Sequence, residues 1–271
     1  MKTIELEELR TIQMGILDVV HDFCIKNGIR YSLACGSMLG AVRHKGYIPW
    51  DDDIDIYVPR SDYERLVRIF PEEVGGVKLV SLEREPLWDR AFAKAYDCRT
   101  VLSQHRKSAM TIGVNVDVFP IDSVPDSDKE WLRYNRLRRT LIKVHMSKYS
   151  RIRKENPLLK NVDLVIRKAI LLPFSSRRLA CRVSRFAQRY NGKEGCGRSF
   201  ECVLGMKQKR PFPSSLMDDL VSVPFEDRRY MAMRDSDAYL SNGFGDYMQL
   251  PPKEQQVLPH NITAWWKEEK I

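Results

Sequence analysis

The sequence has no run of eighteen apolar residues, so it predicts no transmembrane helix. Its first ten residues, MKTIELEELR, are acidic and lack an apolar stretch, so no signal peptide is expected. Six cysteines in 271 residues are few, and without export they are expected to stay reduced in the cytoplasm. Internal repeats and low-complexity tracts are also absent. The composition, 43% hydrophobic and 30% charged, excludes a collagen, a disordered chain and a coiled-coil rod.

The composition that remains is typical of a globular protein with a sizeable core. The chain is 43% hydrophobic and 30% charged, and its length suits one large domain or two small ones. Segments with helical periodicity alternate with short apolar segments bounded by turn residues. This pattern predicts an α/β fold, in which helices flank a mixed sheet that carries a site at its edge.

Positive charge is concentrated in one part of the chain. Residues 133–190 contain 17 Lys or Arg against two acids, whereas the rest is mildly acidic although the net charge is +9. From about residue 126 the pattern becomes helical, with breaks at Pro157 and Pro173. We therefore expect a catalytic core over residues 1–125. A basic, mostly helical region and a C-terminal section over residues 126–271 are expected to complete the site.

The core divides into expected helices and strands. Apolar residues recurring every three or four positions predict a helix over residues 4–27 that stops at Asn27-Gly28. A second helix is expected over residues 61–70, with Ser61 as its N-cap. Strands are expected over residues 30–35, 54–58, 78–82, 91–96 and 113–119.

The densest chemical feature is the acidic segment Trp50-Asp-Asp-Asp-Ile-Asp-Ile56. In a strand, residues two apart face the same side, so Asp53 and Asp55 project together while Ile54 and Ile56 enter the core. Paired carboxylates on a rigid strand suit Mg²⁺, with Mn²⁺ as the alternative. An acidic turn without a metal is the competing interpretation.

Two further features give this segment a context. Gly36-Ser37 follows an expected strand and opens a helix, an arrangement that lets backbone N–H groups approach a phosphate. Asp117 is a lone charge in an apolar strand, which is costly unless it meets a metal or a base. A Gly-Ser turn, a downstream Asp-x-Asp and a third acid together match the general plan of a nucleotidyltransferase fold.

The segment from Tyr31 to Ile56, YSLACGSMLGAVRHKGYIPWDDDIDI, closely resembles the signature of the LicD family. That family contains bacterial phosphocholine transferases and is related to the fukutin-type sugar-phosphate transferases. The resemblance continues through residues 59–63, 92–94, 117–122 and 245–252, and spans the chain from the first helix to about residue 260.

The resemblance implies metal-dependent transfer of a phospho-alcohol, typically from CDP-choline, onto a sugar hydroxyl. Asp53, Asp55 and Asp117 would be the metal-binding and catalytic acids, with Asp117 completing the metal site or acting as the base. Gly36 and Ser37 would hold the donor phosphates. Other CDP-alcohols are alternative donors. A nucleotidyltransferase acting on a small sugar or phosphate, and a non-catalytic nucleotide- or membrane-binding scaffold, are the alternative functions.

Three cations are candidates for binding the substrate. Arg43 and Lys45 lie between Gly36-Ser37 and the acidic segment, where they could neutralise phosphates or merely solvate a loop. Lys94 lies on an expected strand among small residues, where it could pair with a phosphate or with Asp117, or face solvent.

The basic segment suggests a partner for the protein. Residues 157–190 combine apolar runs with arginines and lysines, a composition that fits an anionic membrane surface or a solvated basic face. A glycan acceptor, either on the cell surface or as a lipid-linked precursor, would be met at such a membrane. We therefore expect a cytoplasmic protein, peripheral at the inner face of the membrane. Nucleic acid is not expected as a partner, because no DNA- or RNA-binding motif accompanies the charge.

Overall fold

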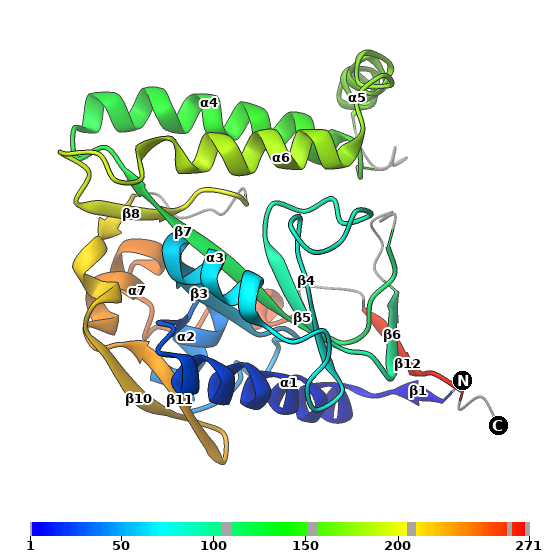
Figure 1. Ribbon diagram of the computed structural model, residues 1–271, viewed down its shortest axis with the longest axis vertical. Coiled ribbons are helices and arrows are strands. Elements are labelled where there is room, and N and C mark those ends of the chain that lie inside the picture. Colours follow the sequence, from blue (N-terminus) through cyan, green and yellow to red (C-terminus); the bar gives the residue numbers. More distant parts are fainter. Residues whose placement is uncertain (1, 104–109, 151–156, 205–209, 259–261, 269–271) are drawn as a thin grey trace.

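A curled mixed sheet forms the centre of the molecule, and a layer of helices lies on one side of it (Figure 1). The computed structural model describes residues 2–103, 110–150, 157–204, 210–258 and 262–268. Within these ranges the chain forms seven α-helices, twelve strands and three short 3₁₀ helices, η1 (Gln188–Tyr190), η2 (Ser214–Met217) and η3 (Lys253–Gln255). The predicted mixed α/β fold is confirmed.

The central sheet has the strand order β2–β3–β7–β5–β4, and β8 and β9 extend it beside β7. Its strands are β2 (Ser32–Leu33), β3 (Asp55–Pro59), β4 (Val77–Val80), β5 (Ala93–Asp97), β7 (Asn115–Val124), β8 (Arg198–Glu201) and β9 (Phe212–Pro213). Among the described strands of this sheet, β3 and β7 are the one parallel pair. Because both strands start at the same edge, Asp55 lies directly opposite Asp117.

The two central strands are held by apolar residues that enter the core. Ile54, Ile56 and Val58 are fully buried, as are Val116 and Val118 on the neighbouring strand. The prediction that Ile54 and Ile56 enter the core is confirmed. The acids at the strand starts are therefore anchored by side chains that stabilise the fold through hydrophobic burial.

Three helices pack against this sheet: α1 (Leu6–Asn27), α2 (Cys35–Arg43) and α3 (Arg60–Ile69). Helix α1 contacts β5 and β7, and α3 contacts β3 and β7. Helix α1 ends at Gly28, which has a φ of +60° and whose N–H donates to the carbonyls of Cys24 and Ile25. The predicted stop at Asn27-Gly28 is confirmed, because only glycine takes this left-handed conformation cheaply.

The structure corrects two of the predicted elements. Ser61 is not the N-cap of α3, since β3 runs straight into the helix and Pro59 occupies the cap position. Strand β7 extends to Val124, beyond the predicted end at residue 119, because its second half pairs with β8. That pairing joins residues nearly eighty positions apart, which local sequence patterns do not reveal.

Smaller elements complete the molecule around the sheet. Strand β12 (Thr263–Trp266) lies between β1 (Thr3–Ile4) and β6 (Thr100–Ser103), so it brings the two ends of the chain together. Strands β10 (Leu220–Phe225) and β11 (Arg228–Met233) form a hairpin, which is followed by α7 (Ser236–Phe244).

The helical layer consists of α4 (Asp128–Ser147), α5 (Leu158–Ile170) and α6 (Ser176–Ala187). Helices α4 and α6 lie side by side, and α5 projects at one end of the pair (Figure 1). Helix α5 begins after Pro157 and α6 follows Pro173, so the predicted breaks are confirmed. The division at residue 125 stays a prediction; β8, from beyond it, pairs with β7 in the central sheet.

No helix within the described ranges is both long enough and apolar enough to cross a lipid bilayer.

Buried His145 makes the helical layer sensitive to acid. Its Nε2 lies 2.9 Å from the Asp89 carbonyl oxygen, and burial lowers the pKa of the imidazole to about 4. Between pH 6.5, the ordinary pKa of histidine, and about pH 4, this imidazole is protonated in the unfolded chain but neutral in the folded protein. The free energy of unfolding therefore falls as the pH drops through this range, by up to about 3 kcal/mol. Urea unfolding at pH 7 and pH 4.5 measures this loss. His145→Gln should remove most of it, and an unchanged pH dependence in the variant would contradict the assignment.

Candidate active site

The predicted acids Asp55 and Asp117 lie side by side at the start of the parallel strand pair. Their Cα positions are partners in the β3–β7 register, and Lys94 on β5 is the partner of Asp117 on its other side. Lys94 Nζ lies 2.6 Å from Asp117 Oδ1 and donates to Asn115 Oδ1 at 2.9 Å. Lys94 is thus buried and paired with Asp117, and the solvent-facing alternative is wrong.

Three further carboxylates gather immediately before β3. Asp51, Asp52 and Asp53 each offer a carboxylate oxygen, and these oxygens lie within 4.8 Å of one another. Asp52 is buried, and the other two are partly buried. The acidic segment therefore presents its charges together, next to the pair formed by Asp55 and Asp117.

Burial and this crowding of carboxylates together raise the pKa of Asp55. Burial, followed by repulsion from Asp53, Asp117 and Asp51, raises the pKa of the Asp55 carboxyl well above its ordinary value, and Lys94 opposes the shift. A strand start that concentrates carboxylates in this way destabilises the fold unless a cation joins them.

The Gly36-Ser37 turn lies against the same acids. Ser37 Oγ accepts a hydrogen bond from the Asp55 N–H at 2.9 Å, which ties the first turn of α2 to the start of β3. A Cβ at position 36 would lie 2.5 Å from Asp51 Oδ2, so only glycine lets this carboxylate approach the helix N-terminus. The structure therefore brings Gly36 and Ser37 to the acids; their contact with donor phosphates stays a prediction.

The turn is entered through a strained residue. Cys35 has a φ of +48°, a left-handed conformation that non-glycine residues rarely adopt. Its N–H donates to Tyr239 Oη on α7 at 3.0 Å, and its thiol lies 3.4 Å from Tyr57 Oη. Two buried tyrosines thus hold the backbone in the conformation that leads into Gly36-Ser37.

Residues on α1 hold the acidic segment from the other side. The Arg10 guanidinium donates to the carbonyl oxygens of Ile48, Pro49 and Asp51, at distances between 2.7 and 3.2 Å. Gln13 Nε2 donates to the Asp52 carbonyl oxygen at 3.0 Å. Arg10 and Gln13 were not predicted as site residues, because a helix about forty residues upstream gives no local sign that it meets this loop.

Arg43 is the last residue of α2, and Lys45 lies in the loop that connects this helix to the acidic segment. Arg43 donates to the carbonyl oxygen of Tyr247 at 2.7 Å and to His44 Nε2 at 2.9 Å. Lys45 Nζ donates to the Val42 carbonyl oxygen at 3.2 Å. Both cations therefore contact the protein itself, and Arg43 joins the end of α2 to the predicted C-terminal motif around Tyr247. Phosphate binding by either residue stays a prediction.

The donor set fits a hard divalent cation. Carboxylate oxygens are the ligands that Mg²⁺ prefers, and Mg²⁺ takes one or two of them together with substrate phosphates. The gathering of Asp51, Asp52 and Asp53, and the repulsion that acts on Asp55, both favour a cation at this edge. Asp53, Asp55 and Asp117 stay the predicted ligands, and Asp51 and Asp52 were not predicted.

Comparison with known proteins defines the class to which this fold and site belong. Residues 28–152 match the family model described as LicD/FKTN/FKRP, nucleotidyltransferase domain. The matched range contains Gly36-Ser37, the acidic segment, Lys94 and Asp117.

A relative is similar to this chain over nearly its whole length. The lipopolysaccharide cholinephosphotransferase LicD of Haemophilus influenzae is 32% identical over 277 residues, covering 97% of this chain and 98% of the relative. The ribitol 5-phosphate transferase FKRP of human and of mouse is 34% identical over 86 residues, which are 32% of this chain and 15% of FKRP. The chain belongs to the LicD family, and the resemblance seen in its sequence is confirmed.

Proposed function

We propose that this protein transfers phosphocholine, or a similar phospho-alcohol, from a CDP-linked donor to a hydroxyl of a cell-surface glycan or its lipid-linked precursor. The observation that carries the proposal is the full-length similarity to a lipopolysaccharide cholinephosphotransferase. The partial similarity to a ribitol 5-phosphate transferase supports the class of transferred group. Both relatives are named for moving a phosphate that already carries an alcohol.

The reaction requires charge neutralisation and positioning more than covalent chemistry by the protein. The acceptor hydroxyl attacks the phosphorus that bears choline, the bond from this phosphorus to the bridging oxygen breaks, and CMP leaves. Mg²⁺ bound at this site would neutralise charge on the phosphate oxygens. Asp53 and Asp55 would hold the metal, in a nucleotidyltransferase-like arrangement.

The remaining residues would orient the donor and acceptor around these acids. Asp117 either completes the metal site or accepts the proton of the acceptor hydroxyl. In either role the charge of Asp117 is balanced by Lys94 Nζ at 2.6 Å. Where Asp117 completes the metal site, the hydroxyl proton passes to the departing CMP phosphate. Gly36 and Ser37 would contact the donor phosphates from the start of α2, and Arg43 and Lys45 would supply positive charge.

The geometry predicts that Arg10 contributes to metal binding without touching the metal. Arg10→Ala removes the hydrogen bonds to the carbonyls of the acidic segment, so Mg²⁺ affinity should fall by about ten- to a hundredfold, as for other residues that orient metal ligands. Titration calorimetry with Mg²⁺ measures the loss. Lys26→Ala, an exposed change on the same helix, is the control. Equal affinities in both variants would contradict the positioning role.

The working location follows from the acceptor. A lipid-linked glycan precursor is assembled on a membrane, so we place the protein in the cytoplasm, peripheral at the inner face, with residues 157–190 toward anionic lipid.

A panel of donors tests the proposed function. The purified protein is incubated with Mg²⁺, a lipid-linked glycan extract and either CDP-choline, CDP-ethanolamine, CDP-glycerol or CDP-ribitol, and CMP release is measured. We expect acceptor-dependent, EDTA-sensitive CMP release with one of these donors, CDP-choline first. Absence of CMP release with all four donors would contradict the proposal.

A further inference from the structure

Helix α5 exposes an unusually apolar surface. Of its thirteen residues, Leu164 is the one that is buried, and the large apolar residues on the other side are open to solvent. This apolar face consists of Leu158, Leu159, Val162, Val165, Ile166 and Ile170, and Leu172 continues it in the following turn. Leu159 is 83% exposed and Leu158 is 77% exposed. Such a patch on a folded protein marks an interaction site more often than chance exposure.

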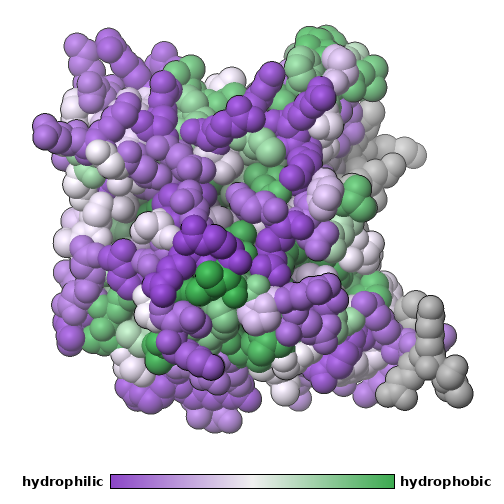
Figure 2. Space-filling view, in the orientation of Figure 1, coloured by the Kyte–Doolittle hydropathy of each residue, from purple (hydrophilic) through white to green (hydrophobic). Residues whose placement is uncertain are grey.

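The spacing of these residues places them on one side of the helix. Residues 158, 162, 165, 166 and 170 recur at intervals of three and four, which is the period of a single helical face. Leu164 lies on the opposite side and anchors α5 to the rest of the protein. Figure 2 shows the hydrophobic atoms gathered at the end of the helical layer, where Figure 1 places α5. The apolar face therefore points away from the core.

The neighbouring helix α6 differs from α5, although the sequence grouped them together. Its apolar residues Leu179, Ala180, Val183 and Ala187 are buried, and α6 packs against α4. Its exposed side carries three arginines spaced three and four residues apart, Arg178, Arg182 and Arg185, and Arg189 in η1 continues the series. Helix α6 thus presents positive charge to solvent. Of the two helices, α5 is the one that exposes large apolar residues, and Leu172 in the following turn extends this apolar face.

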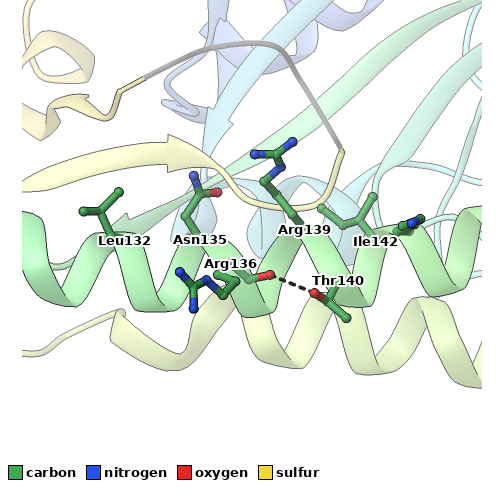
Figure 3. A pocket seen from close by; sticks show the side chains of 7 residues that line it. Leu132, Asn135, Arg136, Arg139, Thr140 and Ile142 are labelled. Carbon is green, nitrogen blue, oxygen red and sulfur yellow. Dashed lines mark hydrogen bonds between the residues drawn. The ribbon is translucent and has the colours of Figure 1, made fainter.

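Helix α4 adds to this positive surface. A hollow of about 660 Å³ runs along it, and the lining residues that the structure describes all belong to α4 (Figure 3). These described residues include Arg136, Arg139 and Lys143, and none of them is acidic. The layer formed by α4 and α6 is therefore cationic on both helices, beside the apolar face of α5.

We infer that α5 docks on an anionic lipid bilayer, with its apolar face in the boundary between headgroups and acyl chains. Thirteen helical residues measure about 20 Å, shorter than the roughly 30 Å hydrocarbon core, which suits a helix lying in the plane of the interface. The arginines of α6 and the cations of α4 attract anionic headgroups.

The same observations disfavour two other occupants. A second copy of this chain would bring its own cationic α4 and α6 against the cations of the first, whereas anionic lipid complements them. Nucleic acid would match the charge but would leave the apolar face of α5 in water. An anionic bilayer both attracts the cations of α4 and α6 and removes the apolar face of α5 from water.

Sedimentation with vesicles tests the inference without any substrate. Vesicles of equimolar phosphatidylglycerol and phosphatidylcholine are expected to bind the wild-type protein, and pure phosphatidylcholine vesicles to bind it weakly. Leu159→Ser/Ile166→Ser should weaken binding to the anionic vesicles by at least about tenfold, since buried apolar groups supply much of the affinity. Leu87→Ser/Val257→Ser is the matched control, because its residues are 62% and 61% exposed but lie outside α5.

The charge is tested separately from the apolar face. Arg178→Glu/Arg182→Glu/Arg185→Glu should remove the preference for phosphatidylglycerol. Compared with the wild type, which has five tryptophans of its own, Leu159→Trp should add a blue-shifted emission that brominated lipid quenches, which reports insertion. Equal binding by the wild type and the α5 serine variant, or an unquenched tryptophan, would overturn the inference. A dimer that the serine variant dissociates, without vesicle binding, would assign α5 to a second copy instead.

One consequence rests on the proposed function. The α5 serine variant should keep its turnover on a detergent-dispersed acceptor and lose turnover on an acceptor embedded in anionic vesicles. Vesicle binding without any turnover would overturn the proposed function alone. Turnover that is insensitive to the α5 variant in vesicles would overturn the docking role alone.

Discussion

Asp53→Asn is expected to reduce turnover by more than about a hundredfold and to leave the protein folded. The change removes one charge from the carboxylates at the start of β3, where charge developing on the phosphates must be balanced, and single groups in that role contribute about this much. CMP release measures turnover, and circular dichroism checks the fold. A variant that keeps a tenth of the wild-type rate would count strongly against the metal role.

A neighbouring change separates function from stability. Asp55→Asn should also abolish turnover, yet raise the melting temperature at neutral pH, because burial and three nearby acids oppose ionisation of this carboxyl and raise its pKa. Asp128→Asn, whose side chain is 85% exposed, should change neither quantity. A lower melting temperature for Asp55→Asn would show that the carboxylates stabilise the fold.

Breaking the buried ion pair between Arg60 and Asp122 is expected to cost about 3–5 kcal/mol of unfolding free energy. Arg60 donates to both carboxylate oxygens of Asp122 at 2.8 and 2.7 Å, and the two side chains are 9% and 0% exposed. Arg60→Ala leaves the Asp122 carboxylate buried with only Asn191 as a remaining side-chain donor among the described contacts. Urea unfolding at pH 7 measures the cost.

An exposed pair provides the comparison. Arg234 and Asp219 form a salt bridge at 2.9 Å, but their side chains are 63% and 62% exposed. Arg234→Ala should cost less than about 1 kcal/mol, because water screens the pair. If both alanine variants lost the same free energy, burial would not be what makes the Arg60–Asp122 pair important.

Local patterns were enough to predict the elements that carry the acids. The alternation of Ile54 and Ile56 with Asp53 and Asp55 predicted the strand and its buried side, and Gly28 predicted where α1 ends. Local patterns were not enough to predict contacts between segments that are distant in the sequence. The pairing of β12 with β1 and β6 joins the two ends of the chain, and neither end carries a local signal of the other.

The same limit applies to the site. Asp117 was recognisable because a charge between apolar strand residues needs a partner, and Lys94 supplies it. Asn115, two residues before Asp117 on β7, could have been found by the same alternation, since it accepts from Lys94. Arg10 and Tyr239 could not have been found from the sequence pattern, because they contact backbone groups of the site from the distant helices α1 and α7.

The central claim is that an intact phospho-alcohol moves to a glycan hydroxyl, and a doubly labelled donor tests it most directly. CDP-choline labelled with ¹⁴C in the choline methyl groups and with ³H in cytidine is incubated with Mg²⁺ and the lipid-linked glycan extract. We expect ¹⁴C in the glycan, ³H in released CMP, and neither transfer with Asp53→Asn. Tritium in the glycan would mean attack on the other phosphorus, and would contradict the account by making the protein a nucleotidyltransferase.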